Sequence, residues 1–276
     1  MNEIISYIII GILQGVVEWL PISSQGNLMV YLSNVLNLSS QLSLNYSILL
    51  HIGTLLAAIV YFYKEIKSLL TVKNISLLFK YNFKLLKIKE SNLDKDFSYL
   101  RFIFITVIVT LLISGPIYFL ISDGINNFNI LLINLIIGLL LFITGFLIFF
   151  SRKIFSKKPV LSIKNSFLLG LFQGFSILPG LSRSGLTTSL LLFRGFSPEK
   201  AFRISFLVSI PTIFIGEIAL LVFNGLFFSP YILISIVVSF IVGYFTIDLL
   251  IKFAKKINFS YFCFILGFIY ILTYFI

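Results

Sequence analysis

Long apolar stretches separated by short polar segments dominate this chain of 276 residues. A helix needs about 20 apolar residues to cross the roughly 30 Å hydrocarbon core of a bilayer. Six stretches are long enough and predict six membrane-spanning helices, at 46–63, 99–121, 129–150, 202–224, 231–251 and 259–276. The pattern therefore predicts an all-α integral membrane protein.

Two shorter apolar stretches, 4–20 and 163–178, differ from these six. Each is followed by a proline, by Ser and Gly residues, and by a second short apolar piece, at 28–36 and 186–193. At 1.5 Å per residue, none of these pieces crosses the bilayer comfortably. We therefore expect two re-entrant helical hairpins, each of which enters the membrane, breaks and returns to the same side.

The two hairpins are related in sequence. Gly-Ile-Leu-Gln-Gly at 11–15 recurs as Gly-Leu-Phe-Gln-Gly at 170–174, and Ser-Ser-Gln-Gly at 23–26 recurs at the same spacing as Ser-Arg-Ser-Gly at 182–185. Three spans follow each hairpin, and because three is odd the second copy must be inverted relative to the first. Broken helices of inverted repeats meet near the midplane and line a polar cavity. We expect one membrane domain with two repeats: domain 1–276, repeat one 1–150, repeat two 160–276.

Composition and charge set the class of protein and its orientation. Hydrophobic residues make up 59% of the chain and charged residues only 11%, against about 25% charged in soluble domains, which excludes an ordinary soluble enzyme. All of the 21 Lys and Arg residues except Arg183 lie in or beside segments that the topology places on one side. The positive-inside rule makes that side the cytoplasm, so both termini face outward and the protein spans the cell (cytoplasmic) membrane several times. The net charge of +11 thus reflects basic loops, and we expect no nucleic-acid partner.

The largest of these segments is a basic cytoplasmic loop at 64–98. Its central part alternates Lys with Leu, Phe and Ile, which suits an amphipathic helix on the anionic inner leaflet. A solvated linker is the alternative, and the sequence leaves both open.

Candidate chemistry gathers at the two hairpin breaks. Gln14 and Glu18 are four residues apart and share one helix face, and oxygen ligands of this kind suit Mg²⁺ or Ca²⁺. Arg183 lies in the second break, where a charge costs about 2.5–3.5 kcal/mol even on the lenient insertion scale. It therefore needs an anion, which is either Glu18 in a structural ion pair or a bound phosphate. Together these groups suit metal-assisted attack on a diphosphate.

At these residues the sequence resembles the undecaprenyl-diphosphatase family, the bacitracin-resistance phosphatases. The motifs read Gln-Gly-Val-Val-Glu at 14–18, Pro-Ile-Ser-Ser-Gln-Gly-Asn at 21–27 and Pro-Gly-Leu-Ser-Arg-Ser-Gly at 179–185, and the match runs over essentially the whole chain. The resemblance implies hydrolysis of a polyprenyl diphosphate to the monophosphate lipid carrier and phosphate. That reaction recycles the carrier for cell-wall or surface-glycan synthesis.

The resemblance also assigns roles to particular residues. It implies a divalent metal at Gln14 and Glu18, phosphate binding by Arg183, and Ser24 or Ser182 as nucleophile. Asn27 and Ser184 complete the candidate catalytic set, and the candidate substrate-binding residues are Gln25, Gly26, Gly180 and Gly185.

One position departs from the family pattern. The first motif of the family carries a His where this chain has Asn27, and Asn cannot transfer protons near neutral pH. The only His of the chain, His51, is either a packing residue or a substitute proton carrier.

Several alternatives stay open. A transporter or flippase of polyprenyl phosphate or another anionic lipid would use the same inverted repeat. Asp248 is expected to pair with Lys252 four residues on, whereas Glu217 is either protonated or faces the central cavity. The expected partners are the polyprenyl diphosphate and the lipid bilayer. A homodimer is compatible with the sequence, which does not set the oligomeric state.

Overall fold

The computed structural model describes residues 3–81, 94–124, 129–152, 159–224 and 230–275, which form helices and no strand. The first half of the chain contains α1 (Glu3–Val17), α2 (Ser24–Val35), α3 (Ser40–Leu49), α4 (His51–Tyr61), α5 (Tyr63–Leu69), α6 (Val72–Tyr81), α7 (Lys95–Gly124) and α8 (Ile130–Ser151). The second half contains α9 (Ile163–Phe175), α10 (Arg183–Phe193), α11 (Pro198–Asn224), α12 (Pro230–Phe253) and α13 (Ser260–Leu272).

Five of the described helical segments are long and apolar enough to cross a membrane: Ser40–Tyr61, Lys95–Ile121, Ile130–Ser151, Pro198–Phe223 and Pro230–Phe253. They confirm five of the six predicted spans. The first begins earlier than expected, because α3 and α4 follow each other with only Leu50 between them.

The sixth predicted span, 259–276, differs from the prediction. It contains the 13-residue helix α13, which is shorter than a full crossing requires. A turn at 273–275 follows the helix, so the apolar stretch continues beyond the end of α13. α13 packs along α8.

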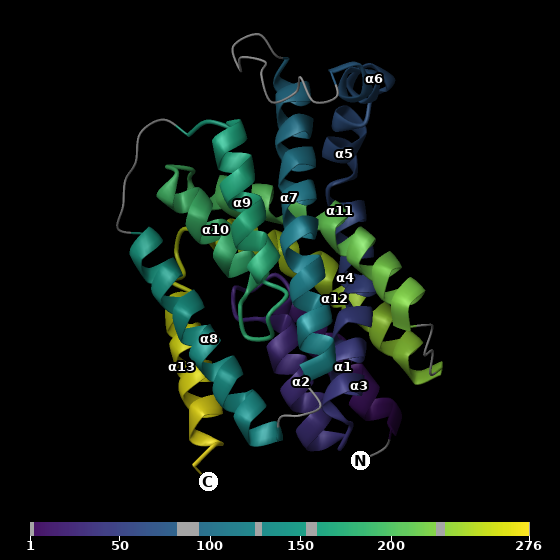
Figure 1. Ribbon diagram of the computed structural model, residues 1–276, viewed down its shortest axis with the longest axis vertical. Helices are drawn as coiled ribbons and strands as arrows, with labels where there is room; N and C mark the ends of the chain where they lie inside the picture. The colour runs from purple at the N-terminus through teal and green to yellow at the C-terminus, as the bar shows by residue number, and fades with distance from the viewer. Residues whose placement is uncertain (1–2, 82–93, 125–128, 153–158, 225–229, 276) are drawn as a thin grey trace.

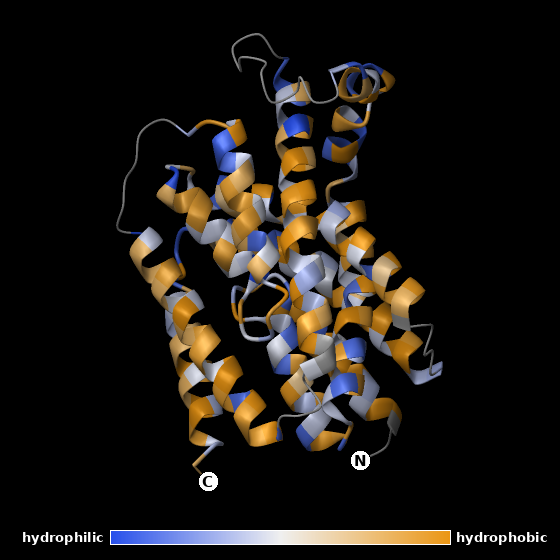
Figure 2. Cartoon of the chain, viewed as in Figure 1, coloured by the Kyte–Doolittle hydropathy of each residue, from blue (hydrophilic) through white to orange (hydrophobic). Residues whose placement is uncertain are grey.

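The outer faces of these helices are apolar. Orange residues run along α8, α11 and α13 in Figure 2, whereas blue residues gather at the upper ends of α5 and α7. Large apolar side chains such as Leu112, Leu120 and Val222 are more than two-thirds exposed. Surfaces of this kind need lipid around them, and the chain is therefore a multi-pass membrane protein.

Both ends of the chain lie at the same end of the molecule, opposite α6 (Figure 1). This agrees with the expectation that both termini face one side. The basic loop 64–98 contains α5, α6 and the start of α7, while its residues 82–93 lie outside the described ones. That α6 rests on the inner leaflet stays a prediction.

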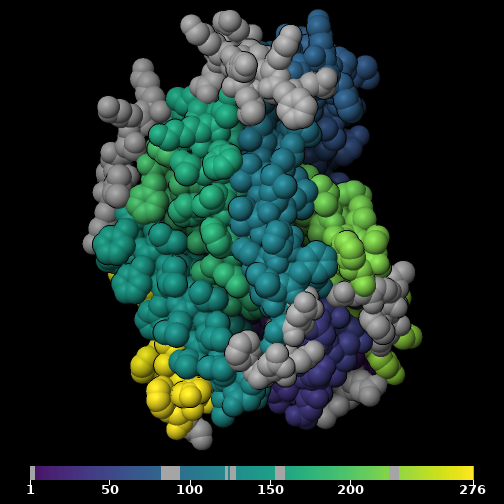
Figure 3. Space-filling model, in the orientation of Figure 1, coloured from purple at the N-terminus to yellow at the C-terminus, as the bar shows by residue number. Residues whose placement is uncertain are grey.

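The first helix of each repeat packs against the other repeat. α1 lies along α12, and α9 lies along α7. Figure 3 shows α9 beside α7 on the front face. A Cβ atom added to Gly15 would lie 2.7 Å from Val242 Cβ, and one added to Gly174 would lie 2.5 Å from Ile113 Cβ. Both contacts use the small-residue spacing that lets membrane helices approach closely. The exchange is reciprocal, as an inverted repeat requires, and the two-fold relation itself stays a prediction.

The helices of each predicted hairpin are interrupted where the sequence indicated. α1 ends before α2 begins at Ser24, and α9 ends before α10 begins at Arg183. The two connecting segments meet between the surrounding helices (Figure 1). They are in direct contact, because the N–H of Gly180 donates a hydrogen bond to Ser23 Oγ at 3.0 Å.

We predict that Gly174→Ala lowers the thermal unfolding temperature of the purified protein, because the new methyl group overlaps Ile113. Overpacking of this kind typically costs about 1–3 kcal/mol. Gly115→Ala is the matched control, since a Cβ at this position of α7 meets nothing within 4 Å. Equal unfolding temperatures for the two variants would contradict the close approach of α9 to α7.

Candidate active site

A partly open cavity lies where the two breaks meet. Its volume is about 870 Å³ when the space at its open entrance is included. Residues of both hairpins line it, together with residues of α3, α4, α7 and α11. Its lining includes most of the predicted site residues, namely Glu18, Ser24, Gln25, Ser182, Arg183 and Ser184. It also includes residues from outside the predicted set, among them His51, Gln173 and Glu217.

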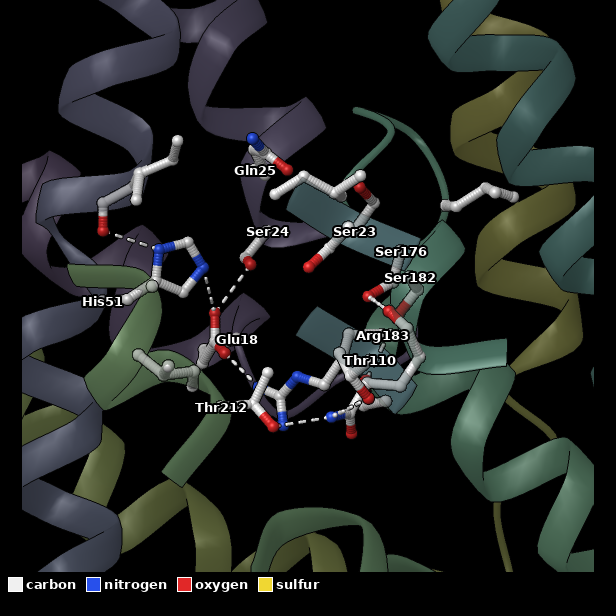
Figure 4. A pocket seen from close by; sticks show the side chains of 18 of the residues that line it. Glu18, Ser23, Ser24, Gln25, His51, Thr110, Ser176, Ser182, Arg183 and Thr212 are labelled. Carbon is white, nitrogen blue, oxygen red and sulfur yellow. Dashed lines mark hydrogen bonds and ion pairs between the residues drawn. The ribbon is translucent and has the colours of Figure 1, made fainter. Parts of the chain in front are cut away.

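Glu18 is the centre of the hydrogen-bond network in this cavity. Its Oε2 accepts a hydrogen bond from Ser24 Oγ at 2.7 Å and lies 3.1 Å from His51 Nε2. Its Oε1 pairs with Arg183 Nη2. Figure 4 shows Ser24, His51 and Arg183 converging on this carboxylate. Glu18 is only 4% exposed, so these partners replace the water that a buried charge loses.

Arg183 forms the ion pair that the sequence offered as a structural alternative. The pair does not use the whole guanidinium, however, because Nη1 is buried with no hydrogen-bond partner among the described residues. The guanidinium carbon lies 5.9 Å from the ring centroid of Trp19. Arg183 is therefore anchored by Glu18 and Trp19 and still has a donor for an anion in the cavity.

Two helices begin at the cavity. Ser23 caps α2 by accepting a hydrogen bond from Gly26 N–H, and Ser182 caps α10 by accepting one from Gly185 N–H. The first N–H groups of a helix have no partner within it, and together with the helix dipole they attract anions. The positive ends of α2 and α10 thus meet at one place, which favours a phosphate there.

The three candidate glycines have a different role from the one expected. They were expected to bind the substrate, but the N–H groups of Gly26 and Gly180 donate to Ser23 Oγ, and that of Gly185 donates to Ser182 Oγ. Their missing side chains allow the breaks to pack, since a Cβ on Gly26 would lie 3.1 Å from the backbone nitrogen of Gly180. Gly180 also has φ = 106°, a left-handed conformation that favours glycine. The glycines thus shape the site without lining its cavity.

The serines fall into two classes. Ser182 Oγ accepts the cap hydrogen bond and lies 3.2 Å from Ser184 Oγ, which in turn donates to the carbonyl of Leu20 at 3.0 Å. Ser24 Oγ, in contrast, donates to a carboxylate. Of the two serines suggested as nucleophile, only Ser24 has the neighbouring base that a nucleophilic hydroxyl needs.

Asn27 does not line the cavity. Its amide nitrogen donates to the carbonyls of Ile22 and Ser23 at 2.7 and 2.8 Å, and Tyr270 OH donates to its carbonyl oxygen. The side chain thus ties the backbone of the break to the start of α2, where the carbonyl of Ser23 also accepts the backbone N–H of Asn27 at 3.1 Å. Asn27 was expected in the catalytic set, but in the structure it lies outside the cavity lining and its side chain holds the break.

His51 lies in the site, although packing was one of its two expected roles. Its Nδ1 is 2.8 Å from the carbonyl oxygen of Ile48, and its Nε2 faces Glu18. No motif marked His51 as a site residue, because it begins α4, far in sequence from both breaks. Asp248 is outside the site and pairs with Lys252 at 2.5 Å, as predicted.

The residues expected to hold a divalent metal fit it by the chemistry of their donors. Gln14 lies behind Glu18 and donates to it from Nε2 at 3.2 Å, while its buried Oε1 has no hydrogen-bond partner. An oxygen without a partner beside a carboxylate suits a hard cation. The described residues contain no group of three or more His, Cys, Asp or Glu side chains that could hold a metal. A cation here would therefore take one or two carboxylates and further oxygens, including those of a phosphate.

Comparison with known proteins shows the family of the chain. The family model described as bacitracin resistance protein BacA matches residues 7–269. The chain belongs to this family. It is 35% identical to an undecaprenyl-diphosphatase of Methanococcoides burtonii over 98% of this chain and 97% of that protein. It is 35% identical to one of Saccharolobus solfataricus, covering 92% and 90%, and 34% identical to one of Borrelia recurrentis, covering 100% of each.

We predict that Ser23→Ala destabilises the protein more than Ser39→Ala does. Ser23 accepts hydrogen bonds from both hairpins, so its loss removes a helix cap and also leaves the buried Gly180 N–H unpaired, each costing about 1–2 kcal/mol. Ser39 caps only the exposed start of α3. Thermal unfolding of both variants in detergent measures the difference, and equal losses would contradict the bridging role of Ser23.

Proposed function

We propose that this protein hydrolyses a polyprenyl diphosphate of the undecaprenyl type to the lipid monophosphate and inorganic phosphate. Family membership and the names of the relatives support the reaction. The observation that carries the proposal is the cavity itself. A carboxylate-bound serine, an arginine with a free donor and two helix N-termini face one space.

The anionic end of the substrate binds at the two helix N-termini. Arg183 donates from Nη1 to the phosphate oxygens, and competition from the phosphate loosens its pairing with Glu18. Fixed donors of this kind stabilise the charge that develops when a phosphoryl group is transferred. Gln25, at the start of α2, lines the same space and supplies a further amide.

Ser24 is the nucleophile in this proposal. Its hydroxyl oxygen attacks the terminal phosphorus while Glu18 accepts the hydroxyl proton. The bond from that phosphorus to the bridging oxygen breaks, and the lipid monophosphate leaves. Water then hydrolyses the phosphoserine, which releases phosphate and restores Ser24. Ser182 and Ser184 keep the start of α10 in place during both steps.

A divalent cation, Mg²⁺ or Ca²⁺, is part of the proposal, with Glu18 and Gln14 as the residues that would hold it. When bound, it supplies positive charge that draws electrons away from the phosphoryl oxygens. The surroundings of the site also suit a lipid substrate, since Ile48, Leu111 and Ile213 form apolar parts of the cavity wall.

We place the protein in the cell membrane, with the basic loop on the cytoplasmic side. The product carrier would then be recycled for cell-wall or surface-glycan synthesis. The bacitracin resistance named in the family description is consistent with this role.

We predict that purified protein releases phosphate from a long-chain polyprenyl diphosphate, that EDTA abolishes the release, and that Ser24→Ala lowers kcat by at least about 10³-fold. Ser33→Ala is the matched control. It removes a hydroxyl from the same helix, but one that bonds to Ser43 outside the cavity. An active Ser24→Ala variant would reject Ser24 as the nucleophile and favour direct attack by water.

His51 is the candidate proton carrier, because Asn27 cannot transfer protons and lies outside the cavity lining. We predict that His51→Gln, which keeps a hydrogen-bond donor beside Glu18, lowers kcat by about 10²-fold or more with little change in KM. Steady-state kinetics provide the measurement. Full activity in His51→Gln would reject His51 as the proton carrier and assign it a packing role.

Transport is the alternative, and the same preparation distinguishes it. A transporter or flippase would move an anionic lipid across proteoliposomes without releasing phosphate. Absence of hydrolysis by the native protein under all metal conditions, together with movement of the lipid, would replace the hydrolase proposal.

A further inference from the structure

Glu217 is a buried carboxylate that the proposed mechanism does not use. It lies in α11, is 5% exposed, and lines the same cavity as Glu18. Neither of its carboxylate oxygens has a hydrogen-bond partner among the described residues. Burial of an unpaired carboxylate is costly, and proteins seldom keep one without a partner.

Protonation alone does not account for Glu217. A neutral carboxyl group is a hydrogen-bond donor and acceptor, and no described residue provides a partner for either role. The side chain also lies close enough to Glu18 and His51 to interact electrostatically with both. The missing partner of Glu217 is therefore to be sought inside the cavity.

A second unpaired oxygen belongs to another residue of the same cavity lining, Gln173. Thr212 and Glu217 of α11 both line this cavity as well. Gln173 donates from Nε2 to Thr212 Oγ1 at 2.8 Å and to Thr110 Oγ1 at 3.2 Å. Both amide hydrogens thus have acceptors, while Gln173 Oε1 is buried without a partner.

The cavity therefore has two chemically different sides. Its free donors lie at Arg183 and the helix N-termini, and they suit phosphate oxygens. Its free acceptors lie at Glu217 and Gln173, where the described residues offer no donor. Oxygen acceptors that include a carboxylate bind a hard divalent cation, which typically uses one or two carboxylates and the phosphate oxygens of the substrate.

We propose that Glu217 is a carboxylate ligand of the divalent cation, and that it holds the cation together with Glu18 across the same cavity. This inference rests on the proposed function and deepens it. Gln14 lies behind Glu18 and does not line the cavity, so the second carboxylate of the site comes from α11 and not from the Gln-x-x-x-Glu motif. The diphosphate then lies between the cation and Arg183.

Direct cation binding tests the proposal without a turnover assay. The chain has a single tryptophan, Trp19, next to Glu18 and beneath Arg183. Tb³⁺, a luminescent substitute for Ca²⁺, is titrated into the purified protein while tryptophan is excited, and Mg²⁺ or Ca²⁺ is then added to displace it. We expect Glu217→Gln to weaken binding of Mg²⁺, Ca²⁺ and Tb³⁺ by about tenfold or more.

Glu199→Gln is the matched control, because it also removes a carboxylate from α11. Glu199 does not line the cavity and pairs instead with Lys255, at a distance of 2.7 Å. It should bind the cations as the native protein does. Thermal unfolding in EDTA monitors the fold, and Glu217→Gln should unfold at the same or a higher temperature because it removes an unpaired buried charge. Added Mg²⁺ should stabilise the native protein and not this variant.

Native-like cation affinity in Glu217→Gln, or no cation binding by the native protein, would overturn the proposal. Phosphate release is measured on the native protein in parallel. Cation binding that needs Glu217, without any phosphate release, would support this site and reject the hydrolase. Metal-dependent phosphate release by the native protein, with unchanged cation binding in Glu217→Gln, would support the hydrolase and reject Glu217 as a cation ligand.

Discussion

A broken helix inside a bilayer exposes backbone groups that no water can satisfy, and each costs several kcal/mol if it stays unpaired. The centre of this molecule depends on meeting that constraint twice in one place. Ser23 Oγ accepts a hydrogen bond from a backbone N–H of each hairpin, those of Gly26 and Gly180. The side chain of Asn27 donates hydrogen bonds to two carbonyls of the first break. The two breaks therefore satisfy each other, and the cavity exists because they must lie together.

The position of the site was predictable from the sequence for the same reason. Pro, Ser and Gly residues within short apolar helices, repeated along the chain, indicated two interrupted helices that line a polar space. Because the repeat brings the two breaks together, Glu18, Ser24 and Arg183 were predicted to lie in one site, and they do lie together. Five of the spans followed from apolar length alone.

The remaining parts of the site depend on contacts between distant segments. Whether His51 and Glu217 face the centre depends on the rotation of α4 and α11 about their own axes. The apolar sequence of a single helix does not reveal that rotation. Asn27 was misassigned because its motif gives its neighbours in sequence and not the direction of its side chain. The sixth span was overestimated because the apolar composition continues into the turn that follows α13.

The pairing of Arg183 with Glu18 has a consequence for selectivity. While the two are joined, the carboxylate beside Ser24 has its charge balanced, and the serine is held next to a base that is already engaged. Only a ligand anionic enough to compete for the guanidinium releases it. Under the proposed mechanism, an anionic headgroup would therefore free the carboxylate to act as the base for Ser24, whereas a neutral lipid in the cavity would leave the ion pair intact.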